Sequence, residues 1–189
     1  MKIQKLAKFR FHVNRKVLWT VLGATVVCWN PGSARAENEC KAVFDAGDKL
    51  TATPHHGYQT STVQTKGAKQ ETGEDIFVGG AFYVLIHGQW RKSPLTVEQK
   101  KNMERENRQN ARNVSCRYLR DEVVNGEAVK VFQAHSETPE LRADSVVWIA
   151  KSTGLILRQE EDVDSGEGDR SHVSVRYEYR NVSAPAVSH

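Results

Sequence analysis

The sequence lacks the short motifs that mark the common enzyme sites. It contains no G-x-S-x-G nucleophile elbow, no P-loop and no G-x-G-x-x-G dinucleotide fingerprint. Metal-ligand spacing is missing too, because His55 and His56 are adjacent and cannot converge on one ion. His87 and His135 fall on predicted strands without supporting ligands. These absences predict a protein that is not an enzyme and that uses no metal or cofactor.

A run of apolar residues long enough to span a membrane is also lacking. The apolar stretch at residues 17–29 is shorter than the about 20 residues that a spanning helix needs. It follows a basic segment without acids and precedes a small-x-small cleavage site at residues 34–36. This order predicts a secretory signal peptide over residues 1–36, cleaved after Ala36, and a periplasmic mature chain without a stable membrane span. The alternatives are an uncleaved signal anchor and lipid attachment at Cys28, although the residue before Cys28 is not small.

A strong excess of one charge is absent once this leader is set aside. The leader holds seven of the 27 Lys and Arg residues and none of the 23 Asp and Glu residues. Residues 37–189 therefore carry 20 basic and 23 acidic side chains, a formal net charge of −3. Nucleic acids and anionic membranes bind to a basic patch on a folded domain, so the composition supports neither partner.

Cysteine is scarce: of three in the chain, one lies in the leader, and Cys40 and Cys116 remain. An even number in an exported protein favours a disulfide. Such a bridge would close a loop of 76 residue steps, worth roughly 4 kcal/mol in the chain-entropy model. The alternative is a free Cys116 thiol beside His135 on the facing strand, which conflicts with an oxidising compartment.

What the sequence does contain is a series of hairpin signals. Gly154 ends the turn between two strands in residues 144–164, at a position that requires φ > 0. Gly79-Gly80 joins strands 72–78 and 81–87, and the second strand is apolar on both faces, as in a covered or cavity-lining strand. Further strands are expected at residues 58–65 and 173–179, the latter with clean alternation of apolar and polar side chains.

The clearest hairpin joins residues 114–123 to residues 127–135 through Asn125-Gly126, the preferred pair for a two-residue I′ turn. The expected opposite pairs are Val124 and Glu127, Asp121 and Lys130, Leu119 and Phe132, and Cys116 and His135. One face of this hairpin would then carry Cys116, Tyr118, Val129 and Val131, and the other Leu119, Val123, Phe132 and Ala134.

Two helices are expected. The first covers residues 37–51 and ends before Pro54. The second follows a capping box formed by Thr96 and Gln99 and extends to about Arg112. Because the second helix is almost entirely polar, its sequence favours a solvated connector over a flap above a cavity.

The order of these elements predicts an α+β fold. About eight strands follow one another by hairpins, which makes a meandering antiparallel sheet with the helices on one face. One domain is expected over residues 37–182, followed by a disordered tail at residues 183–189. The acidic residues Glu160, Glu161, Asp162 and Asp164 precede a Gly-rich loop and indicate a solvated charge run or, at most, a loose Ca²⁺ site.

One hairpin also carries a family resemblance. Residues 148–158, WIAKSTGLILR, are followed by acids and by a closing strand with RYEY at residues 176–179. This layout resembles the periplasmic LolA/LolB-like superfamily, which includes lipoprotein carriers and the sensor domain of RseB-type regulators. The resemblance implies a half-barrel, a curved antiparallel sheet with helices covering its concave face and an apolar cavity for acyl chains. No residue matches the carriers' gating arginine, and the Cys40/Cys116 pair departs from the carrier pattern, so an uncharacterised relative is expected.

The resulting functional hypothesis is a non-catalytic binding protein for an acyl chain, a lipid or a lipoprotein, held in a sheet-lined cavity. The alternative is a protein-interaction or envelope-stress module that docks a partner on the sheet. Whether Trp148 or Ile149 points inward is left open by the turn at Gly154. The candidate cavity-lining residues are Tyr83, Leu85, Trp90, Trp148, Leu157 and Tyr177.

Overall fold

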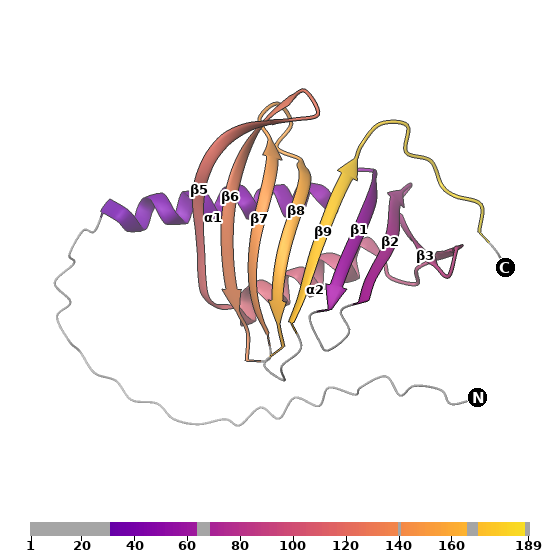
Figure 1. The fold of residues 1–189 in the computed structure, drawn as a ribbon, viewed down its shortest axis with the longest axis horizontal. Coiled ribbons are helices and arrows are strands. Elements are labelled where there is room, and N and C mark those ends of the chain that lie inside the picture. Colours follow the sequence, from indigo (N-terminus) through magenta and orange to yellow (C-terminus); the bar gives the residue numbers. More distant parts are fainter. Residues whose placement is uncertain (1–30, 64–68, 140, 166–169, 188–189) are drawn as a thin grey trace.

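The computed structural model describes residues 31–63, 69–139, 141–165 and 170–187. In this part of the chain, nine antiparallel strands form one curved, open sheet, and both helices lie on the same face of it (Figure 1). The elements are α1 (Pro31–Leu50), β1 (His55–Val63), β2 (Lys69–Val78), β3 (Ala81–Ile86), β4 (Gln89–Lys92), α2 (Val97–Asn110), β5 (Arg112–Val124), β6 (Glu127–Glu137), β7 (Arg142–Ala150), β8 (Ile156–Asp164) and β9 (Arg170–Glu178). The expected α+β architecture is confirmed, with β4 as a strand that the sequence did not indicate.

The strand order is β4-β3-β2-β1-β9-β8-β7-β6-β5. Most neighbours are joined by hairpins, but β1 pairs with β9, which brings the last strand against the first. The two edge strands, β4 and β5, are consecutive in the chain and are connected by α2. The second helix must therefore cross the face of the sheet from one edge to the other, as Figure 1 shows.

The first helix begins at Pro31, six residues before the expected start, and proline is well tolerated in a first helical turn. The expected cleavage point after Ala36 falls inside this helix, and most of the predicted signal peptide lies outside the described residues. Ala46, almost fully buried, packs its helix onto a core of Phe132, Val147, Ile149 and Ile156. Among the described residues, no helix has the length and apolar character to cross a bilayer.

The disulfide between Cys40 and Cys116 is present and joins α1 to the edge strand β5, with the two Cα atoms 4.9 Å apart. The bridge confirms the expected pairing. It also excludes the thiol alternative, because Cys116 is bonded and is paired with Ala134 in the sheet instead of His135.

The register predicted for the β5–β6 hairpin is right near its turn and wrong beyond it. Val124 faces Glu127 and Asp121 faces Lys130, as expected. A bulge between Tyr118 and Arg120 then adds one residue to β5. The expected pairs Leu119–Phe132 and Cys116–His135 are replaced by Tyr118–Phe132, Cys116–Ala134 and Ser115–His135.

The bulge also changes which side chains share a face. A one-residue shift moves every later side chain to the other side of the sheet. Phe132 therefore lies with Cys116 and Tyr118 on the side of α1, where Tyr118 contacts the Phe132 ring edge-on. Val129 and Val131, expected beside Cys116, lie on the opposite side.

We call the side of the sheet that carries α1 and α2 the helix-covered face, and the other side the open face. The open face has its own apolar cluster, in which Val129, Val131 and Trp148 are buried and Leu119, Val124, Val146 and Leu157 are half-buried. A second register irregularity lies between Trp148 and Ile149, whose orientation the sequence left open. Ile149 points to the helix-covered face and Trp148 to the open face.

Candidate functional site

A cavity of about 910 Å³ opens on the helix-covered face, where the end of α2, the start of β5 and the turn between β6 and β7 meet. This volume falls in the range of pockets that bind small molecules. The lining residues are Phe44, Glu106, Asn107, Arg108, Gln109, Asn110, Ala111, Arg112, Val114, Ser136, Thr138, Pro139, Leu141, Ala143 and Glu161.

The cavity exists because α2 does not seal the sheet. None of the residues of α2 is buried, and its capping box at Thr96 and Gln99 forms as expected. The helix is held instead by polar contacts at its two ends. Lys100 lies over the Phe82 ring, with the ammonium 5.4 Å from the ring centroid, and Arg108 contacts both Asp48 and Phe44 of α1. A helix without an apolar stripe cannot pack closely on an apolar sheet, so space is left beneath its C-terminal end.

The apolar part of the lining is formed by Phe44 from α1, Val114 from β5, and Leu141 and Ala143 around the start of β7. Val114 and Leu141 are each 40% exposed although both are aliphatic. Ala143 is buried. The cavity therefore has an apolar wall with two aliphatic side chains open to solvent, a pattern typical of ligand-binding surfaces.

Glu161 is the charged group of special interest in this lining. It is half-buried and faces Ser145 and Val173 in the sheet. Burial raises the pKa of its carboxyl, and a hydrogen bond with Ser145 partly opposes this shift. The sequence indicated a solvated charge run here. Alternation along β8 instead turns Glu161 inward and Glu160 outward, where Glu160 pairs with Arg158.

On the same face, a group of polar residues lies between the sheet and α2. We call this group, formed by Tyr177, His55, Asp75 and Glu104, the polar floor. Burial raises the pKa of the Tyr177 hydroxyl, and the negative charges of Asp75, Glu161 and Glu104 raise it further. His55, only 3% exposed, contacts the Tyr177 ring edge-on at 5.5 Å. Its Nε2 lies 3.4 Å from an Asp75 carboxylate oxygen.

The structure does not gather the six residues predicted to line a cavity. Tyr177 lies on the helix-covered face, packed against the α1 core. Trp148 and Leu157 belong to the apolar cluster of the open face. Trp90 contacts His56, also on the open face, and pairs with Leu85. Tyr83 and Leu85 alternate with Phe82, which faces Lys100 of α2, and so they too point to the open face. Ligand contact by these residues stays a prediction.

The residues that do line the cavity were missed for an identifiable reason. Leu141 and Ala143 precede the strand expected from residue 146, and β7 in fact begins at Arg142. Val114 starts the strand expected at residues 114–123, but all six candidate residues were chosen from other strands. No local signal in the sequence reports that α2 crosses above them.

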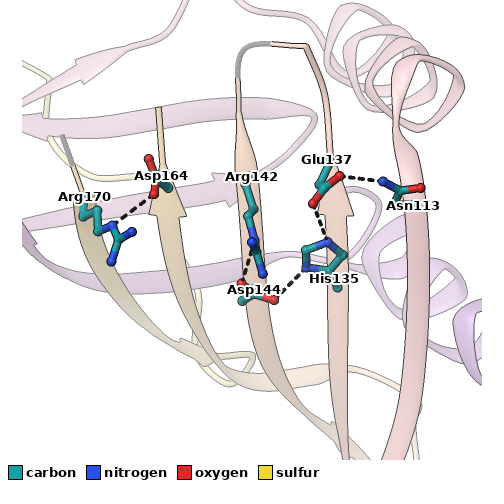
Figure 2. Close-up of polar contacts among 7 residues, drawn as sticks. All are labelled: Asn113, His135, Glu137, Arg142, Asp144, Asp164 and Arg170. Atoms are coloured by element: carbon teal, nitrogen blue, oxygen red, sulfur yellow. Dashed lines mark hydrogen bonds and ion pairs between the residues drawn. The ribbon is translucent and has the colours of Figure 1, made fainter. Parts of the chain in front are cut away.

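The open face carries a polar ladder at the end of the sheet near the β6–β7 turn (Figure 2). Nδ1 of His135 lies 2.7 Å from Asp144 and its Nε2 lies 3.2 Å from Glu137. Asn113 donates to Glu137 at 2.6 Å, and the Arg142 Nε lies 3.4 Å from Asp144. Hydrogen bonds from Asn113 and His135 lower the pKa of Glu137, and a hydrogen bond from His135 lowers that of Asp144.

The ladder continues onto β8 and β9. Arg170 donates to Asp164 at 3.0 Å, and Nδ1 of His172 lies 2.8 Å from Asp162. A hollow of about 410 Å³ lies among these side chains. Despite the density of His and Asp, no group of three or more His, Cys, Asp or Glu in the described residues is placed to hold a metal ion. The carboxylates here serve cross-strand pairing.

No protein-family model matches this sequence, and no curated protein sequence is similar enough to match it. Solved structures match it at low sequence identity. LprF from Mycobacterium bovis is 12% identical, with a TM-score of 0.44 over 82% of this chain and 99% of its own. The lipoprotein LppX from Mycobacterium tuberculosis is also 12% identical, with a TM-score of 0.40 over 78% and 97%.

A LolA superfamily protein from Nitrosomonas europaea matches at 7% identity and a TM-score of 0.27, over 77% of this chain and 94% of its own. Because each of these TM-scores is below 0.5, the matches carry no argument about function, which has to come from the cavity itself.

Proposed function

We propose that this protein is a non-catalytic, periplasmic binding protein that holds an apolar ligand, an acyl chain, a lipid or the lipid of a lipoprotein, in the cavity beside the end of α2. The observation that carries the proposal is the cavity of about 910 Å³, with Phe44, Val114 and Leu141 in its lining. Burying partly exposed aliphatic side chains against a chain of methylenes is favourable by about 25 cal/mol per Å². The export signal expected in the sequence supports the compartment.

The test is binding of a neutral fluorescent apolar probe, N-phenyl-1-naphthylamine, to the mature chain, followed by displacement with alkyl ligands. We expect saturable binding by the wild type. The double variant Val114→Asn/Leu141→Asn should bind the probe about tenfold more weakly, since it replaces two apolar contacts with amides.

The matched control is Val123→Asn, in the same strand as Val114. Val123 is 67% exposed and does not line the cavity, so its replacement should leave probe affinity unchanged. Equal affinity of the double variant and the wild type would contradict the proposed site. Native mass spectrometry of the purified protein checks for lipid retained from the cell.

A second candidate function is docking of an envelope protein on the open face. The observation that favours it is the apolar cluster around Trp148 and Leu157, on the face that neither α1 nor α2 covers. Leu157→Asn separates the two functions, because it alters this cluster and leaves the cavity intact. Loss of probe binding in Leu157→Asn would count against the cavity and for the open face.

A further inference from the structure

The charged groups around the cavity are unevenly balanced. Arg108 already pairs with Asp48 at 2.5 Å, and its guanidinium lies over the Phe44 ring. Arg112 and Glu106 are exposed at the rim. Glu161 is half-buried, and within the described residues it forms no ion pair with a basic side chain. The most enclosed charge of the lining is therefore an acid without a cation.

The groups behind Glu161 do not correct this balance. Asp75, Glu104 and Glu161 all act on the Tyr177 hydroxyl as negative charges. The cationic candidates on this floor have partners of their own: His55 lies by Asp75 at 3.4 Å, and Lys100 lies 4.0 Å from Glu104. What remains uncompensated is the Glu161 carboxyl, which is hydrogen-bonded only to the neutral side chain of Ser145 among the contacts described for it.

We propose, building on the apolar-ligand function above, that the ligand carries a protonated amine next to its apolar chain and that the Glu161 carboxylate selects it. A carboxylate held away from water is costly unless a cation and hydrogen bonds compensate it. An ammonium entering the cavity supplies three donors to the acceptor oxygens and forms a charge-assisted hydrogen bond. The apolar chain can then lie along Phe44, Val114 and Leu141.

The raised pKa of Glu161 agrees with this geometry, because burial of the carboxyl disfavours its negative charge. A neutral ligand would leave that cost in place. An anionic ligand would add a second negative charge close to Glu161 and is expected to be rejected. The selectivity therefore depends on the ligand's charge at constant chain length.

The experiment compares three amphiphiles of one chain length, dodecylamine, dodecanol and dodecanoate, as competitors of the neutral probe at pH 7 and below their micelle concentrations. Each is measured on the wild type, on Glu161→Gln and on Glu160→Gln. Glu160 is the matched control because it is the adjacent acid of the same strand, faces the open side and pairs with Arg158.

In the wild type and in Glu160→Gln, we expect dodecylamine to bind about tenfold more tightly than dodecanol, as one charge-assisted hydrogen bond implies. Dodecanoate should bind most weakly. In Glu161→Gln the amine and the alcohol should bind within about twofold of each other, while dodecanol keeps its wild-type affinity, which also reports an intact cavity.

A negative result for the apolar-ligand function differs from a negative result for the amine selectivity. If none of the three amphiphiles displaces the probe from the wild type, both the apolar-ligand function and the amine selectivity are wrong. If they displace it without preference for the amine, or if the preference survives in Glu161→Gln, only the amine selectivity is wrong. The comparison of the three amphiphiles on the wild type tests the preference for the amine even if Glu161→Gln fails to fold.

Discussion

At the scale of single residues, the Asp75 carboxylate lies in the space that a side chain at position 57 would occupy. A Cβ at Gly57 would lie 2.3 Å from the Asp75 Oδ1 and 3.0 Å from its Cγ. A side chain at this position would displace the Asp75 carboxylate, which passes directly across the neighbouring strand. Asp75 can thereby reach His55, which is buried against Tyr177 and Phe77.

Gly57→Ala should therefore lower the free energy of unfolding by about 1 kcal/mol, because the new methyl forces the Asp75 side chain away from His55. Gly73→Ala is the control, since it lies in the paired strand β2 with nothing within 4 Å of the new Cβ. Urea unfolding of both variants measures the difference. Equal midpoints for the two variants would show that Asp75 moves aside at no cost.

At the scale of elements, the polar helix α2 is the part of the fold most weakly held. It has no buried residue, and the only ion pair described between it and α1 is that of Arg108 with Asp48. Its length is set by the need to connect β4 at one edge of the sheet to β5 at the other. A helix attached in this way can lie above a cavity because it has no apolar stripe that would pack onto the sheet.

Arg108→Ala should increase amide hydrogen exchange across residues 97–110 without changing exchange in the core strands β6 to β8. The reason is that local opening of α2 costs little once its link to α1 is removed. Arg105→Ala is the control, because the contacts described for Arg105, with Glu98 and Asn102, stay within α2. Uniform acceleration in the strands as well would show that α2 stabilises the whole sheet.

At the scale of the whole molecule, a disulfide ties the first helix to an edge of the sheet. The bridge from Cys40 to Cys116 spans 76 residues of sequence and encloses the second half of α1, β1 to β4, α2 and the start of β5. It also positions Phe44 of α1, one turn further along the helix, in the cavity wall. The cross-link therefore contributes both to stability and to the shape of the candidate site.

Cys40→Ala/Cys116→Ala should lower the free energy of unfolding by roughly 4 kcal/mol, the loop-closure value for a loop of this length. Reduction of the wild type with dithiothreitol should shift its urea midpoint toward that of the variant, and the variant itself should not respond to the reductant. An unchanged midpoint on reduction of the wild type would show that the bridge contributes little.

Local backbone chemistry explains what could be predicted from the sequence. The Asn125-Gly126 turn, the positive φ at Gly154 and the capping box at Thr96 and Gln99 each depend on residues within a few positions of one another. The disulfide could be predicted as well, since only two cysteines follow the predicted leader. These features were enough to predict the α+β class, most of the strands and both helices.

The faces of the sheet and the cavity were decided by the tertiary structure. A bulge between Tyr118 and Arg120 changes which side chains of the β5–β6 hairpin share the face toward α1, and the sequence shows no sign of it. Since side chains alternate with a period of two, one extra residue moves an entire predicted set to the other side. The inward position of Glu161, and its place in a cavity beneath a crossing helix, follow from this long-range geometry.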